Sequence, residues 1–369
     1  MVSKNITIAV LAEQDPLEHR IAIVPSLLQR YLALGASIAI EQGAWRKTSI
    51  SDASWQEAQI VTRDQALREA DIVIGIQALP ESELTQLKAG TIMISLVYPD
   101  IRPTWTKIAC TQKLTVFALE RMPRISRAQS MDVLSSQASC AGYVAVIKGA
   151  SLLQRYLPML TSAAGTIKPA QVLVLGVGVA GLQAIATAKR LGAQVRAFDV
   201  RPSTKEQIES LGAKAIDLGI SGEGSGGYAR VLTDAEQEKI TTVLTEEISK
   251  ADLIITCAGV PGKPAPRLIT AAMITRMKQG AVIVDTMAEQ GGNCELTSKG
   301  TTISQNTITI CGETHLPSRL AQHASELFSK NIFAFLSPLF TKQHSINIDW
   351  NDELYTATAL CHQGEITKS

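Results

Sequence analysis

Three closely spaced glycines and one aspartate are the residues of this 369-residue chain that most clearly point to chemistry. Gly176, Gly178 and Gly181 form a G-x-G-x-x-G pattern, and Asp199 follows about twenty residues later. The first glycine permits a sharp strand-to-helix turn, the second lets a pyrophosphate approach the backbone, and the third lets the helix pack closely on the strand. The helix N-terminus then offers free N–H groups to the phosphates. The pattern predicts a dinucleotide site in which Asp199 accepts hydrogen bonds from the ribose hydroxyls of NAD and repels the extra phosphate of NADP.

A second group of polar residues lies in Arg124–Ser135, which reads RISRAQSMDVLS. Its members with hydrogen-bonding or charged side chains include Arg124, Arg127, Gln129, Asp132 and Ser135. A nicotinamide carboxamide needs one donor and one acceptor to fix the orientation of its ring, and these side chains can supply both. The alternative is an arginine–aspartate ion pair in which Ser135 caps a helix. The residues alone leave both interpretations open.

A glycine-rich segment, Leu218–Asp234, interrupts the second half of the chain. Its glycines are Gly219, Gly222, Gly224, Gly226 and Gly227. So many glycines make an ordered state entropically costly, and Tyr228 offers a flat surface that could cover a bound base. The segment is therefore either a lid that closes over nucleotide or a surface insertion without function.

Composition narrows the class of protein. The hydrophobic share is 46% with only 4% aromatics, and 35 basic residues balance 34 acidic ones. This balance gives no electrostatic support for nucleic-acid binding. Six scattered cysteines without a C-x-x-C pair indicate a reducing compartment and no zinc site. We find no signal peptide and no window of ~18 apolar residues, so we expect a soluble chain without a membrane span.

The elements that must position these residues form two α/β units. In the first, we expect strands at Ile6–Leu11, Ser37–Glu41, Ile60–Val61, Asp71–Ile76, Thr91–Val97 and Thr115–Ala118, and helices at Pro25–Leu34, Asp64–Ala70 and Pro80–Lys88. Short apolar strands that alternate with helices indicate a parallel sheet covered on both faces. The loops after Leu11, Ile76 and Val97 should face one cleft.

A long helix at Ser135–Leu157 should lead into the second unit. We expect its strands to start at Gln171 and to continue at Val195–Asp199, Ala215–Asp217, Leu253–Thr256, Ala281–Asp285 and Thr307–Cys311. A helix near Pro317–Leu339 returns to the first unit, where Ile346–Ile366 adds a small hairpin. The predicted fold is α/β, with two Rossmann-like domains of parallel doubly wound sheets, a long connecting helix and a cleft between them. The domains are residues 1–134 plus about 318–369, and residues 135–317.

Several longer runs carry a family resemblance. They are RAQSMDVLSSQ at Arg127–Gln137, GVGVAGLQAIATAKRLGA at Gly176–Ala193, DVRPSTKEQ at Asp199–Gln207, GGYA at Gly226–Ala229, PGKPAP at Pro261–Pro266 and EQGGNCE at Glu289–Glu295. Together they resemble the NAD(H)-binding region of the alpha subunit of proton-translocating NAD(P) transhydrogenases. The resemblance extends from His19–Pro25 to Ser325–Asn331. Alanine dehydrogenase belongs to the same superfamily and shares less of this detail.

The resemblance implies a division of labour. This chain would bind NAD(H), a separate beta subunit would bind NADP(H), and hydride would pass directly between the two nicotinamides. Membrane segments of partner chains would conduct protons, and a second, membrane-embedded alpha chain would complete the alpha subunit. The chain would be a homodimer, held at the cytoplasmic side of the inner membrane by its partners.

The resemblance also implies residue roles. Arg124, Asp132 and Ser135 would hold the carboxamide of NAD(H), while Gln129 would reach toward the NADP nicotinamide ribose at the hydride-transfer site. The residues implied in cofactor binding are Arg127, Ser130, Met131, Gly176, Gly178, Val179, Ala180, Gly181, Asp199, Val200, Arg201, Gly227, Tyr228 and Gly259.

An alanine dehydrogenase is the main alternative. Reductive amination of pyruvate needs proton transfers, for which a histidine or lysine near the nicotinamide would be expected. Ile74–Pro80 and Ser95–Pro99, which follow strands of the first unit, contain neither residue type, and Arg20 remains as a possible carboxylate anchor. Hydride exchange between two nicotinamides requires only alignment and exclusion of water. A non-catalytic NAD sensor also remains open, and His315 departs from the transhydrogenase pattern as a surface, capping or ligand residue.

Overall fold

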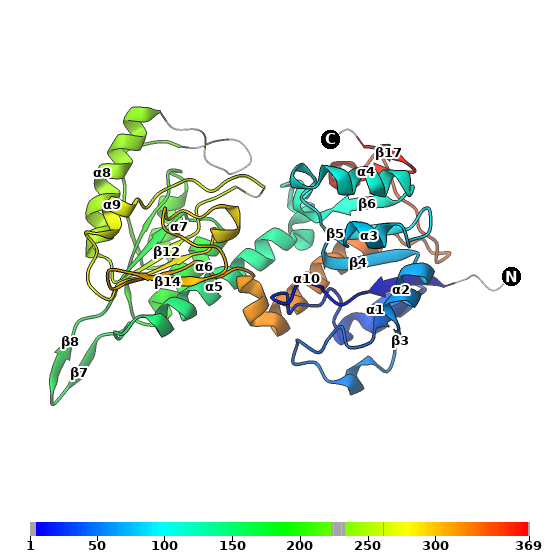
Figure 1. The fold of residues 1–369 in the computed structure, drawn as a ribbon, viewed down its shortest axis with the longest axis horizontal. Helices are drawn as coiled ribbons and strands as arrows, with labels where there is room; N and C mark the ends of the chain where they lie inside the picture. The colour runs from blue at the N-terminus through cyan, green and yellow to red at the C-terminus, as the bar shows by residue number, and fades with distance from the viewer. Residues whose placement is uncertain (1–4, 223, 225–229, 231–232, 261, 368–369) are drawn as a thin grey trace. The chain divides into compact units, whose positions relative to one another are not determined.

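The computed structural model describes residues 5–222, 224, 230, 233–260 and 262–367. The chain divides into unit 1, formed by Met1–Gln137 and Pro317–Ser369, and unit 2, formed by Ala138–Leu316. In Figure 1, unit 1 runs from blue to cyan and again from orange to red, and unit 2 from green to yellow. Each unit contains one large sheet covered by helices, so the predicted α/β class is confirmed.

The sheet of unit 1 has the order β17-β16-β6-β5-β4-β1-β2-β3. Its strands are β1 (Ile6–Val10), β2 (Ala36–Glu41), β3 (Gln59–Val61), β4 (Ile72–Gln77), β5 (Ile92–Leu96), β6 (Thr115–Ala118), β16 (Ala359–His362) and β17 (Glu365–Ile366). Strands β1 to β6 pair in parallel in the doubly wound order, while β16 and β17 add an antiparallel edge next to β6. The predicted hairpin in the C-terminal tail is confirmed.

Helices cover both faces of this sheet because alternate strand residues point to opposite sides. One face packs on α2 (Arg63–Glu69), α3 (Glu81–Leu84) and α4 (Pro103–Thr111). The other face packs on α1 (Leu28–Ala33) and α10 (Ala321–Leu336), where Phe328 and Phe335 are fully buried. The last helix, α11 (Glu353–Thr358), leads into β16. The C-terminal segment therefore supplies core residues to unit 1.

The sheet of unit 2 has the order β11-β10-β9-β12-β13-β15-β14. Its strands are β9 (Gln171–Leu175), β10 (Gln194–Phe198), β11 (Lys214–Ala215), β12 (Leu253–Thr256), β13 (Val282–Asp285), β14 (Thr302–Gln305) and β15 (Ile308–Cys311). The six predicted strands pair in parallel, and β14 is an additional antiparallel edge strand. The chain reverses its direction of winding between β9 and β12, which is where nucleotides bind in such sheets.

Helices also cover both faces of the sheet of unit 2. One face packs on α5 (Val133–Leu152), α6 (Val179–Arg190) and α7 (Thr204–Ser210), and the other on α8 (Asp234–Lys250) and α9 (Ala271–Ile274). Gly149 of α5 lies against the Leu253 side chain, which a β-carbon at that glycine would meet at 2.6 Å. The two layers hold the carboxyl ends of β9, β10, β12 and β13 at one edge of the sheet.

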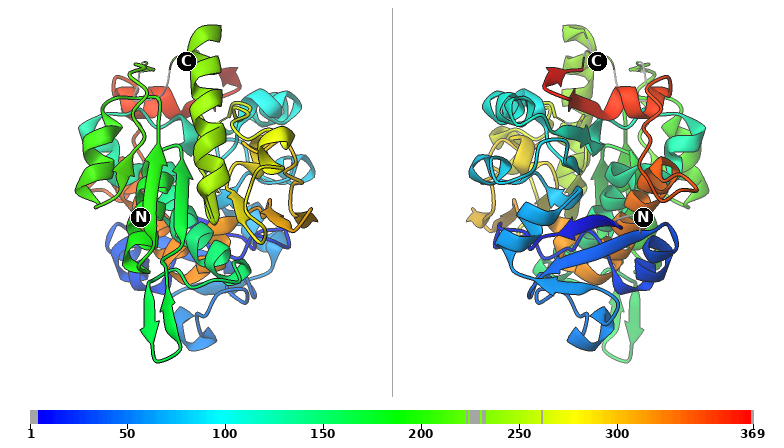
Figure 2. Two further views of the ribbon diagram at one scale, coloured as in Figure 1. Left: turned by 90° about the vertical axis from the view of Figure 1, so that its left-hand side faces the viewer. Right: turned by 90° about the vertical axis from the view of Figure 1, so that its right-hand side faces the viewer.

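Two helix predictions were too long, and one hairpin was not predicted. The long helix ends at Leu152 instead of Leu157, although Leu153 and Leu157 are buried, and α3 ends at Leu84 instead of Lys88. Apolar residues thus continue into non-helical chain, where periodicity cannot mark a helix end. The residues that follow form the hairpin β7 (Leu160–Ser162) and β8 (Gly165–Ile167), which extends away from the body of unit 2 (Figures 1 and 2). No helix among the described residues is long and apolar enough to span a bilayer.

Candidate nucleotide site

The glycine turn joins β9 to α6. Gly176 has φ +89°, and a β-carbon on it would lie 2.5 Å from the Ala258 nitrogen. A β-carbon on Gly181 would lie 2.0 Å from the Gly176 carbonyl oxygen, so only glycine fits. Gly178, in contrast, is exposed, and a β-carbon there would meet nothing within 4 Å. The turn is therefore closed on its protein side and open at Gly178, as a pyrophosphate cradle requires.

Helix α6 begins at the open side of this turn. Val179 is its first residue and is 43% exposed, and the Ala180 backbone lies against Gly142 of α5. A β-carbon on Gly142 would approach the Ala180 carbonyl oxygen to 2.1 Å. Gly142 therefore allows α5 to support the N-terminal turn of α6. No sequence signal distinguished this glycine from others, because its importance comes from a contact between two helices.

Asp199 follows β10 and reaches back to the glycine turn. Its Oδ2 accepts a hydrogen bond from the Val177 nitrogen at 2.7 Å, and its Oδ1 accepts one from the Arg201 nitrogen at 2.9 Å. The Arg201 guanidinium donates to both oxygens, from Nε at 2.9 Å and from Nη2 at 2.8 Å. Burial alone would raise the pKa of Asp199, but Arg201 and the two backbone donors outweigh it, so the pKa lies below its usual value. Asp199 is therefore ionised near neutral pH.

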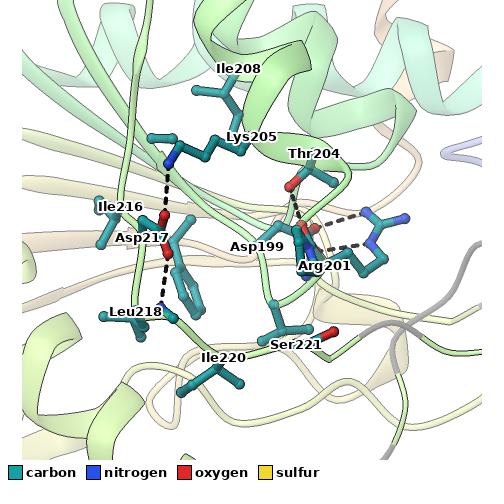
Figure 3. Close-up of a pocket in the computed structure, with 15 residues that line it drawn as sticks. Asp199, Arg201, Thr204, Lys205, Ile208, Ile216, Asp217, Leu218, Ile220 and Ser221 are labelled. Atoms are coloured by element: carbon teal, nitrogen blue, oxygen red, sulfur yellow. Dashed lines mark hydrogen bonds and ion pairs between the residues drawn. The ribbon is translucent and has the colours of Figure 1, made fainter.

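A cavity of about 290 Å³ adjoins this aspartate and is drawn in Figure 3. Asp199, Val200 and Arg201 form one side of its wall, and apolar side chains such as Ile208 and Ile220 form another. Apolar walls with a few fixed polar groups suit the flat base of a nucleoside. The cavity is therefore a candidate site for the adenosine moiety of a dinucleotide.

Two buried side chains that we did not assign from the sequence organise the neighbouring loops. Asn293 is fully buried, donates to the Ala258 and Pro266 carbonyl oxygens at 2.7 and 2.8 Å, and accepts from the Ala258 nitrogen. Asp285, at the end of β13, accepts hydrogen bonds from Thr256 and Thr297 at 2.9 and 2.6 Å. These bonds tie the loop after β12 to the loop after β13. Both residues lie in or near the EQGGNCE run, whose spacing gives no hint of such contacts.

The predicted adenosine contact Gly259 lies in the loop that Asn293 holds. A β-carbon on Gly259 would meet the Met287 methyl carbon at 2.1 Å, so a side chain there would disturb both loops. Gly227 and Tyr228, together with Pro261, lie outside the described residues. The lid interpretation of Leu218–Asp234 therefore stays a prediction.

The polar stretch of unit 1 forms a short helical turn, η5 (Ser126–Met131), followed by α5. Asp132 caps α5: its Oδ1 accepts from the Ser135 nitrogen at 2.9 Å and its Oδ2 from the Ser135 hydroxyl at 2.6 Å. The structure thus brings together two of the three residues predicted to hold the carboxamide. The capping alternative is also realised, with Asp132 instead of Ser135 as the cap.

The other residues of this stretch point to different neighbours. Arg127 forms an ion pair with Asp352 of α11, with Nη1 2.7 Å from Oδ2. The Ser130 carbonyl oxygen accepts a hydrogen bond from Asn331, and Met131 packs on the core of unit 1. Gln129 and Arg124 are exposed, while Ala128 between them is buried. Buried anchors on both sides of Gln129 therefore present it on a fixed turn.

The predicted site residues are divided between the two units. The stretch from Arg124 to Ser135 belongs to unit 1, and the residues from Gly176 to Gly259 belong to unit 2. Within unit 2, the glycine turn, the start of α6 and Asp199 come together, joined by the hydrogen bond from Val177 to Asp199. This set is what a dinucleotide fingerprint requires.

In unit 1, two glutamates occupy the loops in which we looked for a histidine or lysine. Glu13 accepts hydrogen bonds from the Ile76 and Gln77 nitrogens at 2.6 and 3.3 Å, after β4. Glu120 accepts one from the Val97 nitrogen at 3.0 Å, after β5. Burial raises the pKa of both carboxyl groups. The free backbone donors at these strand ends are thus bound by side chains of the same unit.

Glu13 makes the stability of the fold depend on pH. Burial, opposed by the Ile76 hydrogen bond and increased by the nearby Glu18, raises its pKa from 4.5 to about 7. Because the folded state holds this proton more tightly, the free energy of unfolding should fall as pH rises from about 4.5 to about 7. We expect Glu13→Gln to remove on the order of 2 kcal/mol of this dependence. Thermal unfolding between pH 5 and pH 8 measures it, with exposed Glu81→Gln as control; parallel curves for wild type and Glu13→Gln would contradict the assignment.

Arg20, the remaining candidate for a carboxylate anchor, is buried in a network of its own unit. Its Nε and Nη2 donate to the two oxygens of Glu18 at 2.7 and 2.6 Å, and its Nη1 donates to Gln137 at 2.8 Å. Glu18 also accepts a hydrogen bond from Ser318. The network joins three separate segments of the chain, so its evident role is to hold unit 1 together. It offers an external carboxylate little of the Arg20 charge.

His315 lies at a tight turn of unit 2. Its φ is +55°, and its backbone nitrogen donates to Glu289 at 2.8 Å. The histidine ring lies 3.5 Å from the same carboxylate. The predicted turn position is therefore correct, and the contacts are those of a residue that orders the turn.

Comparison with known proteins agrees with this geometry. Residues 9–141 match the family described as alanine dehydrogenase/PNT, N-terminal domain, and residues 145–369 match its C-terminal domain. The chain is 43% identical over 372 residues to the first of the alpha-subunit chains of the NAD(P) transhydrogenase of Rhodospirillum rubrum, with 97% of each chain covered. The chain belongs to the NAD(P) transhydrogenase alpha-subunit family. The resemblance seen in the sequence is confirmed, and with it the oxidoreductase class.

Other relatives place this transhydrogenase-family chain more closely. It is 39% identical to the NAD(P) transhydrogenase subunit alpha of Haemophilus influenzae, covering 94% of this chain and 69% of that protein. A transhydrogenase structure from Sinorhizobium meliloti superimposes with a TM-score of 0.86 at 38% identity, covering 98% of both chains. An L-alanine dehydrogenase structure shares the fold, with a TM-score of 0.80 at 22% identity. Homology thus supports an NAD(H)-binding transhydrogenase component.

Proposed function

We propose that this chain binds NAD(H) as one half of a two-nucleotide reaction, in which hydride passes to or from NADP(H) on a separate beta subunit. The observation that carries the proposal is the glycine turn, which is open at Gly178 and sits beside the ionised Asp199. An open turn with exposed N–H groups suits a pyrophosphate, and an ionised carboxylate suits a ribose diol while repelling a 2′-phosphate. Relatives named as transhydrogenase alpha subunits support the choice of reaction.

Each segment of the site has a separate task in this proposal. Residues at Gly176–Gly181 with Val179 and Ala180 hold the pyrophosphate, and Asp199, Val200, Arg201 and Gly259 hold the adenosine. Arg124, Asp132 and Ser135 orient the carboxamide, with Arg127, Ser130 and Met131 supporting them. Gln129 acts at the hydride-transfer site, and Gly227 and Tyr228 cover the nucleotide. When bound, the nicotinamide supplies or accepts the hydride.

The chain need not supply an acid or a base for this chemistry. Direct hydride transfer between two nicotinamides moves no proton to a side chain, so orientation and exclusion of water are what the protein contributes. The candidate acid–base groups of unit 1 are engaged structurally, Glu13 and Glu120 with backbone donors and Arg20 with Glu18. This arrangement favours transhydrogenation over reductive amination. It leaves the coupling to proton movement to partner chains.

We further propose that the chain is a homodimer that joins a membrane-embedded second alpha chain and a beta subunit at the cytoplasmic face of the membrane. Two features of unit 2 suit a protein partner. The β7–β8 hairpin is exposed along its whole length, with Met159 beside it 65% exposed, and α5 exposes Tyr143 and Ile147 one turn apart. An isolated two-stranded hairpin is only marginally stable in water, so a partner surface would stabilise it.

The decisive experiment mixes this chain with an NADP-binding beta-type subunit. We expect hydride transfer from NADPH to an oxidised NAD analogue, measured by absorbance, which depends on both proteins. Absence of transfer at saturating nucleotide would count against the proposal. Sustained oxidation of NADH by the chain alone with pyruvate and ammonia would instead identify an alanine dehydrogenase.

A further inference from the structure

The described lining of the candidate adenosine cavity includes two cations, and each is paired with an aspartate. Arg201 pairs with Asp199, and the two side chains are 17% and 8% exposed. Lys205 pairs with Asp217 at 2.8 Å, and these side chains are 51% and 54% exposed. Figure 3 shows both pairs among the residues that line the cavity. The cavity thus holds basic groups suited to a phosphate, each with its charge balanced by a carboxylate.

The hydrogen bonds of Asp199 show what a ribose must displace. Its two oxygens accept four hydrogen bonds, from Val177, from the Arg201 backbone and twice from the Arg201 guanidinium. A carboxylate offers about four lone-pair positions, so a ribose diol can bind only where the guanidinium gives way. Arg201 therefore occupies on Asp199 the positions that ribose hydroxyls would take. A guanidinium that leaves Asp199 remains beside the ribose that replaces it.

We infer that the Asp199–Arg201 pair selects NAD over NADP in two ways, and that Arg201 is a latent receptor for a nucleoside 2′-phosphate. Asp199 repels the phosphate directly, and it also neutralises the cation that would otherwise bind the phosphate. An arginine beside the adenosine ribose is what NADP-binding sites of this fold use. The inference rests on the proposed NAD(H) site and extends it to the origin of its specificity.

The energetic argument concerns an unpaired buried charge. Removing the carboxylate of Asp199 would leave the largely buried Arg201 without its partner, which is costly. A phosphate dianion restores the pairing through charge-assisted, bidentate hydrogen bonds. Lys205 is more exposed and keeps Asp217, so its contribution should be smaller. The gain in affinity for NADPH should therefore depend on Arg201 much more than on Lys205.

The experiment measures dissociation constants for NADH and NADPH by nucleotide fluorescence, without any partner subunit. For wild type we expect NADPH to bind at least about 100-fold more weakly than NADH. In Asp199→Ser, NADH should weaken about tenfold or more and NADPH should strengthen about tenfold or more. Asp199→Ser/Arg201→Gln should lose the NADPH gain, whereas Asp199→Ser/Lys205→Gln should keep most of it. Arg201→Gln alone should still reject NADPH because Asp199 remains.

Asp199→Asn guards against a folding defect, because its amide oxygen can still accept from Val177 while its charge is gone. Thermal unfolding of every variant shows which are folded. A gain in NADPH affinity that persists without Arg201, or no gain in either folded Asp199 variant, would overturn the inference and leave the proposed function intact. A wild-type protein that binds neither nucleotide would overturn both.

Discussion

Gln129→Ala should slow hydride transfer by about 100-fold or more while changing NADH affinity less than about threefold. Gln129 is exposed on η5, and the buried Ala128 and the hydrogen bond from Asn331 to Ser130 fix the turn on either side of it. The proposed task of its side chain is to contact the nucleotide of the beta subunit. Losing that contact should impair alignment of the two rings, to which transfer rates are sensitive.

The measurement combines two readouts on the same variant. Titration with NADH reports binding to this chain, and stopped-flow mixing with the NADP-loaded beta-type subunit reports transfer. Ser126→Ala is the matched control, because Ser126 is exposed on the same turn and has no assigned role. A large loss of NADH affinity with an unchanged transfer rate would refute the role of Gln129. Equal slowing by Ser126→Ala would point to the turn instead of the glutamine.

Local patterns predicted the nucleotide turn of unit 2. Gly176, Gly178, Gly181 and Asp199 are constrained by one strand–turn–helix–strand unit, so their spacing already contains the geometry. The sheet orders of both units followed from alternating short strands and helices for the same reason. Membership of the transhydrogenase family was likewise readable, since it depends on several runs at once.

Contacts between distant segments could not be predicted from one sequence. Arg127 pairs with Asp352, which is 225 residues away, and nothing near either residue announces the other. Asn293 and Gly142 matter because two loops or two helices meet at them. The long helix was extended too far because Leu153 and Leu157 remain buried after the helix ends. In each case tertiary packing, and not local preference, decides the outcome.

The glycines of the turn should respond to alanine in opposite ways, and this contrast separates binding from folding. Gly178→Ala should weaken NADH binding about tenfold or more while leaving the melting temperature nearly unchanged. The added methyl group meets no protein atom within 4 Å and projects into the open side of the turn, where the pyrophosphate is proposed to lie. Gly178 also has φ −81°, which alanine adopts without strain.

Gly181→Ala should instead destabilise unit 2, because its β-carbon would lie 2.0 Å from the Gly176 carbonyl oxygen, a backbone atom that cannot move without opening the turn. We expect a melting temperature lower by about 5 °C or more, measured by circular dichroism beside NADH titrations of both variants. If Gly178→Ala left NADH affinity unchanged, the open side of the turn would not be where a pyrophosphate binds. If it lowered the melting temperature as much as Gly181→Ala does, Gly178 would serve the fold and not the ligand. Only loss of binding in a stably folded Gly178→Ala protein is consistent with a turn whose second glycine exists for a phosphate.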